Sequence, residues 1–141
     1  MASASSPRDT DIRLTLPARP QNVAVVRHVL GALADALNLD RVVVDDMRLA
    51  VTEACTNVVR HAYLDGEGTI DVVVRPRRDV LEVVVTDEGR GLGPSPDTAG
   101  PGLGLALIKA LTHSFEIQRS EQSGSRLVMG FSRRTPSMGM T

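Results

Sequence analysis

A glutamate and an asparagine four residues apart are the first side chains in this sequence whose types and spacing could act on one ligand. Glu53 and Asn57 lie in the stretch 43–63, where apolar residues recur at helical spacing. In a helix, residues four apart lie on the same face about one turn apart. A carboxylate can serve as a general base, and an amide oxygen can bind a hard metal ion. The alternative is that both side chains belong to a solvated polar helix face.

A second carboxylate, Asp87, ends a run of β-branched residues and precedes a segment rich in glycine. Side chains alternate across a strand, so Asp87 is predicted to point inward with the apolar residues of its run. Glycines let a backbone approach an anion closely, and a helix N-terminus offers free N–H groups to phosphate. The segment 88–104 is therefore either a phosphate site or a flexible linker. Its clusters GRGLG and GPGLG match neither the dinucleotide-binding nor the P-loop pattern.

The elements that must position these residues follow from apolar periodicity and turn chemistry. The predicted order is strand, helix, helix, strand, strand, glycine loop, helix, strand, strand. Asn38 is expected to end the first helix in the left-handed conformation and Asp40 to cap the second. The predicted fold class is α/β (α+β), a two-layer sandwich with helices on one face of a mixed or antiparallel sheet. The predicted strands are 11–16, 69–75, 80–87 and two more after 112, and the predicted helices are 20–38, 40–63 and 103–112.

Composition limits the classes of function. The chain has 141 residues, 42% of them hydrophobic and 23% charged, which is typical of one globular domain. We expect an ordered domain at 11–133 between polar tails at 1–10 and 134–141. The net charge of −1 and the absence of Trp disfavour direct nucleic-acid binding. No apolar run approaches the ~18 residues of a membrane span, so we expect no membrane insertion and a cytoplasmic location.

Three motifs taken together resemble the GHKL, or Bergerat, ATP-binding superfamily of gyrase, heat-shock chaperone, mismatch-repair and histidine-kinase ATPases. The E-x-x-x-N of the helix looks like its N box, VTDEGRGLG like its D-x-G-x-G box, and GPGLGLALIK like its second glycine box. Together, in this order and spacing, the motifs are specific. The form RLAVTEACTNVVRHAY, on a chain this short, looks most like the bacterial anti-sigma-factor serine/threonine kinases.

This resemblance implies an ATP-dependent and Mg²⁺-dependent protein kinase that binds a sigma factor and phosphorylates a small anti-anti-sigma (STAS-type) protein. It also implies a homodimer. In the implied site, Glu53 is the general base, Asn57 holds Mg²⁺ at the ATP phosphates, and Asp87 accepts a hydrogen bond from the adenine amino group. The other implied nucleotide-binding residues are Gly89 and Gly91 at the adenine pocket, Gly102, Leu103 and Gly104 at the phosphates, Ser125 near the adenine, and His61, which either lines the pocket rim or is structural.

One departure from the family pattern keeps a second interpretation open. In these kinases the loop between the glycine boxes commonly carries basic residues, whereas LGPSPDTAGP at 92–101 has no Lys or Arg. The alternative is a non-catalytic, nucleotide-gated binding module that sequesters a partner without phosphorylating it. Glu53 favours the kinase, and the cation-poor loop favours the module. By its glycine and proline content, the loop 93–101 is predicted to be mobile without nucleotide.

Overall fold

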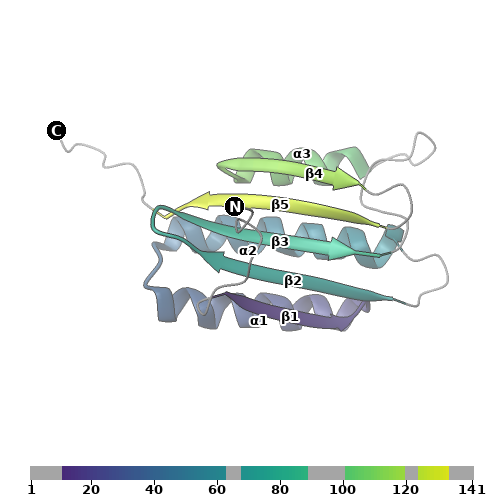
Figure 1. Ribbon diagram of the computed structural model, residues 1–141, viewed down its shortest axis with the longest axis horizontal. Helices are drawn as coiled ribbons and strands as arrows, with labels where there is room; N and C mark the ends of the chain where they lie inside the picture. Colours follow the sequence, from purple (N-terminus) through teal and green to yellow (C-terminus); the bar gives the residue numbers. More distant parts are fainter. Residues whose placement is uncertain (1–10, 63–67, 89–100, 120–123, 134–141) are drawn as a thin grey trace, which may run out of the picture.

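The computed structural model describes residues 11–62, 68–88, 101–119 and 124–133. In this part of the chain, one sheet of five strands has its helices on a single face (Figure 1). The fold class predicted from the sequence is therefore confirmed. The elements are β1 (Ile12–Pro17), α1 (Pro20–Leu37), α2 (Arg41–Asn57), a π-helical turn (Val58–Ala62), β2 (Thr69–Pro76), β3 (Val80–Asp87), α3 (Pro101–Leu111), β4 (Ser114–Arg119) and β5 (Ser125–Ser132).

The sheet is antiparallel throughout the described residues, with strand order β1-β2-β3-β5-β4. Strand β3 is central and pairs with β2 on one side and β5 on the other. Its register places Val85 opposite Val72 and Leu127, and it places Asp87 opposite Ser125. The last residue of β3 and the first of β5 therefore meet at one end of the sheet.

The core lies between the helices and the sheet and is built almost entirely from aliphatic side chains. On β3, Leu81, Val83 and Val85 are fully buried and point to the helices, as alternation along the strand predicts. Full burial of such side chains contributes about 1.5–3 kcal/mol each. Other fully buried members of the core are Leu30 of α1, Met47, Ala50, Val51 and Ala54 of α2, Ile108 of α3, and Leu127 and Met129 of β5.

A tight connection makes α1 and α2 a hairpin. Pro20 occupies the first turn of α1, where its missing N–H is not needed. Asn38 follows the helix with φ 59° and ψ 44°, and its N–H donates to the carbonyl oxygens of Ala34 and Asp35. The predicted left-handed cap at Asn38 is thus confirmed. Asp40 occupies the N-cap position of α2 as predicted, but its side chain makes no capping hydrogen bond.

The helix that carries Glu53 differs from the prediction at its end. A single helix was expected through residue 63, whereas the α-helix ends at Asn57 and a π-helical turn follows at Val58–Ala62. Two β-branched valines, Val58 and Val59, begin that turn, and such residues are weaker helix formers than straight-chain residues. Turns of this kind are rare and often lie next to functional sites.

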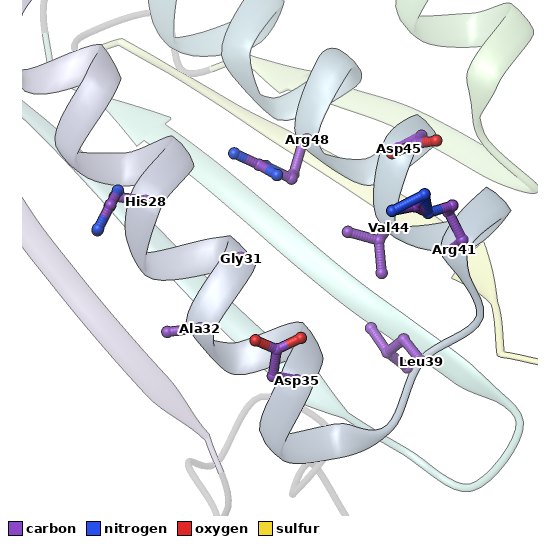
Figure 2. Close-up of a pocket in the computed structure, with 9 residues that line it drawn as sticks. All are labelled: His28, Gly31, Ala32, Asp35, Leu39, Arg41, Val44, Asp45 and Arg48. Carbon is purple, nitrogen blue, oxygen red and sulfur yellow. The ribbon is translucent and has the colours of Figure 1, made fainter.

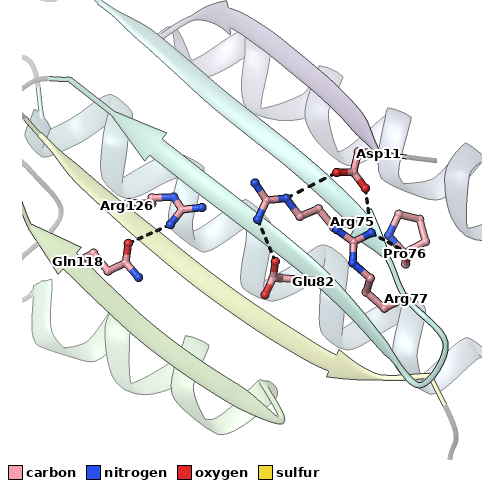
Figure 3. Close-up of polar contacts among 7 residues, drawn as sticks. All are labelled: Asp11, Arg75, Pro76, Arg77, Glu82, Gln118 and Arg126. Atoms are coloured by element: carbon pink, nitrogen blue, oxygen red, sulfur yellow. Dashed lines mark hydrogen bonds and ion pairs between the residues drawn. The ribbon is translucent and has the colours of Figure 1, made fainter. Parts of the chain in front are cut away.

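The face of the sheet that the helices leave open carries ion pairs and a hydrogen-bonded Arg–Gln pair (Figure 3). Arg75 of β2 lies 3.7 Å from Asp11 and 3.2 Å from Glu82 of β3. Arg77 donates to Asp11 at 2.9 Å, and Arg126 of β5 donates to Gln118 of β4 at 2.9 Å. These contacts cross three of the strand pairings, so the network ties neighbouring strands together.

Candidate functional site

Three polar residues, backbone and side chain together, are buried in the part of the chain that the structure describes. Asn57 is 5% exposed, Asp87 2% and Ser125 4%. Burying a polar group costs free energy unless it is hydrogen-bonded, so such groups are retained for a structural or functional reason. All three are residues that the sequence predicts for the site. The structure therefore places the predicted polar residues in the interior, with Asp87 and Ser125 side by side.

Asp87 and Ser125 form a fixed pair at the end of the sheet. The antiparallel register puts them directly opposite each other, and both point to the face that the helices cover. Ser125 donates its hydroxyl hydrogen to Asp87 Oδ2 across 2.9 Å. A hydrogen bond to a charged acceptor in a buried site is stronger than one between neutral groups. The bond fixes the carboxylate plane of Asp87 before any ligand arrives.

The turn before β5 depends on a glycine whose role in the site the sequence did not reveal. Gly124 has φ +38°, a conformation that side-chain-bearing residues rarely adopt. A methyl group at this position would overlap the backbone carbonyl oxygen of Asp87. Gly124 therefore packs directly on the end of β3. The nearest sequence signal is the run Gln122, Ser123 and Gly124, which favours a turn between the last two strands.

Glu53 and Asn57 share one face of α2, as their spacing predicts, and this face meets α3. Asn57 is buried and Glu53 is half-buried. Gly104, in the first turn of α3, lies so close that a methyl group there would be 2.7 Å from Glu53 Oε2 and 3.4 Å from Asn57 Nδ2. The structure thus brings together Glu53, Asn57 and Gly104 from two separate motifs.

A hollow of about 320 Å³ opens at the sheet end beside the Asp87–Ser125 pair. It spans the ends of β3, β4 and β5, and it presents charged groups of both signs. Asp87 and Ser125 are among the residues that line it, together with Gln118 and Arg126, whose side chains lie on the open face of the sheet. Its lining residues are Thr86, Asp87, Glu88, Gln118, Arg119, Gly124, Ser125 and Arg126.

Several predicted site residues fall outside what the structure describes. Gly89 and Gly91 lie beyond the described ranges, as do residues 93–100 of the predicted mobile loop. Gly102 and Leu103 belong to the first turn of α3, and His61 belongs to the π-helical turn, but the structure describes only the backbone at these positions. The roles of these residues stay predictions.

A larger hollow, of about 570 Å³, lies between α1 and α2 and contains none of the predicted site residues (Figure 2). The guanidinium of Arg48 lies beside Gly31 there, 3.7 Å from where a methyl group on Gly31 would be. Arg48 Nε is buried and has no hydrogen-bond partner among the described residues. The lining residues are His28, Gly31, Ala32, Asp35, Leu39, Arg41, Val44, Asp45 and Arg48.

The single cysteine is a core residue and not a nucleophile. Cys55 is fully buried in α2 among apolar neighbours. Burial raises the pKa of its thiol to about 12, because the charged thiolate loses hydration in the core. The thiol is protonated at neutral pH, and only the thiolate is strongly nucleophilic. Cys55 therefore serves as a small apolar residue of the core.

The described residues combine a sheet covered by helices, an acid and an amide on one helix, a carboxylate at a strand end and a glycine at the next helix start. This is the arrangement that the motifs predict for an ATPase-type nucleotide site. The chain matches the family model of the histidine kinase-like ATPase domain over residues 16–131. It belongs to this family. The resemblance read from the three motifs is therefore confirmed.

Relatives with curated names are protein kinases. The chain is 36% identical over 133 residues to the serine-protein kinase RsbW of Halalkalibacterium halodurans, covering 84% of this chain and 80% of that protein. It is 33% identical over 126 residues to the serine-protein kinase RsbW of Bacillus cereus strain ZK / E33L, covering 78% of each. The predicted enzyme class, a protein serine/threonine kinase, agrees with these relatives.

A solved structure supports the fold independently. The crystal structure of the RsbU and RsbW domains of a Mycobacterium tuberculosis protein superposes with a TM-score of 0.73. The match covers 93% of this chain and 34% of that one, at 22% sequence identity, and so concerns the fold alone.

Among the described residues, no helix combines the length and apolar character needed to cross a membrane.

Proposed function

We propose that this chain is an ATP-dependent protein serine/threonine kinase that sequesters a sigma factor and phosphorylates an anti-anti-sigma protein of the STAS type. The observation that carries the proposal is the contact of Glu53 and Asn57 of α2 with Gly104 of α3. This contact places a candidate base and a candidate metal ligand beside the start of α3. The names of the relatives support the choice of kinase within the family. The nucleotide-binding domain is residues 11–133.

The Asp87–Ser125 pair is the adenine end of the proposed site. The buried carboxylate accepts a hydrogen bond from the exocyclic amino group of adenine, and Ser125 keeps that carboxylate in place. Guanine carries a carbonyl oxygen where adenine carries its amino group. Two acceptors would then face each other in a buried site, which costs free energy. The pair therefore selects adenine over guanine.

Asn57 is the residue that would hold Mg²⁺ with the ATP phosphates. Mg²⁺ prefers oxygen ligands and is usually bound by one or two protein groups together with phosphates and waters. The amide oxygen of Asn57 suits this donor set, and its burial beside the start of α3 supports a fixed position. When bound, the ion neutralises charge that develops on the transferred phosphoryl group. The backbone N–H groups at the start of α3 suit the phosphates.

Glu53 is the base that prepares the attacking hydroxyl. It takes the proton from a serine or threonine hydroxyl of the partner as that oxygen bonds to the γ-phosphorus of ATP. The bond from the γ-phosphorus to the bridging oxygen of ADP breaks in the same displacement, and the electron pair leaves with ADP. Transfer of this kind needs mainly positioning and charge stabilisation. A half-buried carboxylate one helical turn from Asn57 suits this role.

A nucleotide-gated binding module is the second candidate function. The absence of Lys and Arg from 92–101 favours it, because transfer in related kinases commonly uses basic residues in this loop. Such a protein would bind ATP or ADP and sequester a partner but transfer no phosphate to it. The proposed partners are the same in both cases, as are a homodimeric state and a cytoplasmic location.

Incubation with Mg·ATP and a candidate anti-anti-sigma protein, followed by mass spectrometry of that protein, tests the proposal. We expect a mass increase of one phosphate on a serine or threonine of the partner. The Glu53→Gln variant should bind the same partner and transfer far less phosphate. A wild-type protein that binds ATP and a partner but never modifies the partner would favour the binding module.

A further inference from the structure

The first turn of α3 lies directly against the two functional side chains of α2, and Gly104 is the point of contact. We propose that Gly104 is a positioning residue that sets the direction of the Glu53 carboxylate. The inference rests on the proposed kinase function, in which Glu53 is the base. It gives Gly104 a role beyond the backbone contact to phosphate that the motif implies.

Distances at this contact leave no room for a side chain at position 104. A methyl group there would lie 2.7 Å from Glu53 Oε2 and 3.4 Å from both Glu53 Cδ and Asn57 Nδ2. Well-packed carbon and oxygen atoms stay farther apart than the first of these distances. Glu53 would have to move, and as the end of a long side chain it can do so by rotating about its own bonds. The fold would survive, but the carboxylate would point elsewhere.

Asn57 limits the directions that Glu53 can take. The amide of Asn57 is buried and lies one helical turn from Glu53 on the same face. Both side chains meet the first turn of α3 at Gly104, so the carboxylate shares this space with the Asn57 amide. General-base catalysis is sensitive to such placement, because the base must lie within hydrogen-bond reach of the proton it removes.

Gly31 supplies a matched control within the same chain. Like Gly104, it is a helical glycine that lies beside the tip of a charged side chain, here the guanidinium of Arg48 (Figure 2). A methyl group on Gly31 would meet Arg48 at 3.7 Å, which is an ordinary contact. Alanine is a better helix former than glycine at both positions. The two substitutions therefore differ chiefly in whether they displace Glu53.

The experiment compares Gly104→Ala with Gly31→Ala in the full chain, using the partner-phosphorylation rate at saturating Mg·ATP and partner. We expect Gly104→Ala to lower kcat on the order of 10²-fold, as displacement of a reacting group by about 1 Å can do. Calorimetry should show ATP affinity unchanged, because alanine keeps the backbone N–H. Gly31→Ala should match the wild type in both measurements.

A double substitution separates positioning from a general disturbance of the site. If Gly104 acts through Glu53, adding Gly104→Ala to Glu53→Gln should lower the residual rate no further. An equal loss in both backgrounds would overturn the inference. The thermal unfolding transition of the Gly104→Ala variant shows whether that variant folds. If the transition is lost, the double variant Glu53→Ala/Gly104→Ala should regain it, because the side chain that opposes the new methyl group is removed. Failure to restore it would also contradict the assigned contact.

Failure of the inference and failure of the proposed function give different results. A wild-type protein that phosphorylates no partner overturns the kinase function and this inference with it. An active wild type whose Gly104→Ala variant is equally active overturns the positioning role alone. In that case the Glu53→Gln result still decides whether Glu53 is the base.

Discussion

Two polar regions of this molecule each contain carboxylate side chains, but the carboxylates have different roles. On the open face of the sheet, Arg75 lies between Asp11 and Glu82, and opposite charges satisfy one another across strands (Figure 3). At the sheet end, Asp87 and Ser125 are buried on the helix-covered face. The first region is a charge-matched structural network. In the second, a hydroxyl fixes a carboxylate, and both residues are among those that line a hollow at the sheet end.

The comparison shows that a buried side chain at a site open to ligands indicates function better than the charge of a side chain does. On the open face, the side chain of Asp11 is only 7% exposed, and the cations of Arg75 and Arg77 lie beside it. A buried carboxylate is costly to keep, so its position beside an open hollow indicates a binding role. We therefore expect substitutions at the sheet end to change binding or transfer, and those on the open face to change stability alone.

Replacement of Glu53 should have the largest effect. Glu53→Gln preserves shape but removes the proton acceptor, so partner phosphorylation should fall ~10²-fold or more while ATP binding persists. Mass spectrometry of the partner over time measures the rate, and calorimetry measures the binding. Transfer at the wild-type rate would remove Glu53 from the role of base.

Replacement of Asp87 should have the next largest effect, and on binding. Asp87→Asn removes the charged acceptor for the adenine amino group, so ATP affinity should weaken by about 1.5–3 kcal/mol. Titration calorimetry with Mg·ATP measures this change, and thermal unfolding checks that the fold is retained. Unchanged affinity would mean that the adenine is bound elsewhere.

The open-face network should respond in the opposite way. Arg75→Ala removes the cation between Asp11 and Glu82 but leaves Arg77 with Asp11, so the free energy of unfolding should fall by about 1–2 kcal/mol. Denaturant unfolding measures this loss. ATP affinity should not change, and a weaker affinity in Arg75→Ala would break the distinction between the two regions.

Ser125→Ala should give the smallest effect. It deletes the hydroxyl that donates to Asp87 Oδ2 and leaves the carboxylate itself in place. Loss of one such hydrogen bond corresponds to about 1 kcal/mol, or a several-fold weaker affinity for ATP. Calorimetry beside Ser132→Ala, at the other end of β5, provides the comparison. An equal loss in both variants would show that the effect is not local to the pair.

Much of the fold could be predicted because local patterns decide it. Alternation along β3 predicts that Asp87 points inward, and alternation along β5 does the same for Ser125; both side chains are buried. The cap at Asn38 follows from its tolerance of the left-handed conformation. These are properties of short segments, which the sequence displays directly.

Long-range packing explains what could not be predicted. A helical wheel puts Asn57 on the polar face of α2, and only the placement of α3 shows that this residue is buried. The contact between Gly104 and Glu53 joins residues from separate motifs, and the two valines after Asn57 do not by themselves specify a π-helical turn. The ion pairs of Arg75 likewise depend on strand register.

Nucleotide selectivity tests the central claim most directly. The claim is that the buried carboxylate of Asp87 recognises adenine by accepting a hydrogen bond from its amino group. Calorimetry of the wild-type protein with ATP, ADP and GTP, each with Mg²⁺, gives the comparison in one experiment. We predict that ATP and ADP bind and that GTP binds far more weakly, since its carbonyl oxygen would face the oxygens of Asp87. Equal affinity for ATP and GTP, or no binding of adenine nucleotides at all, would contradict the account.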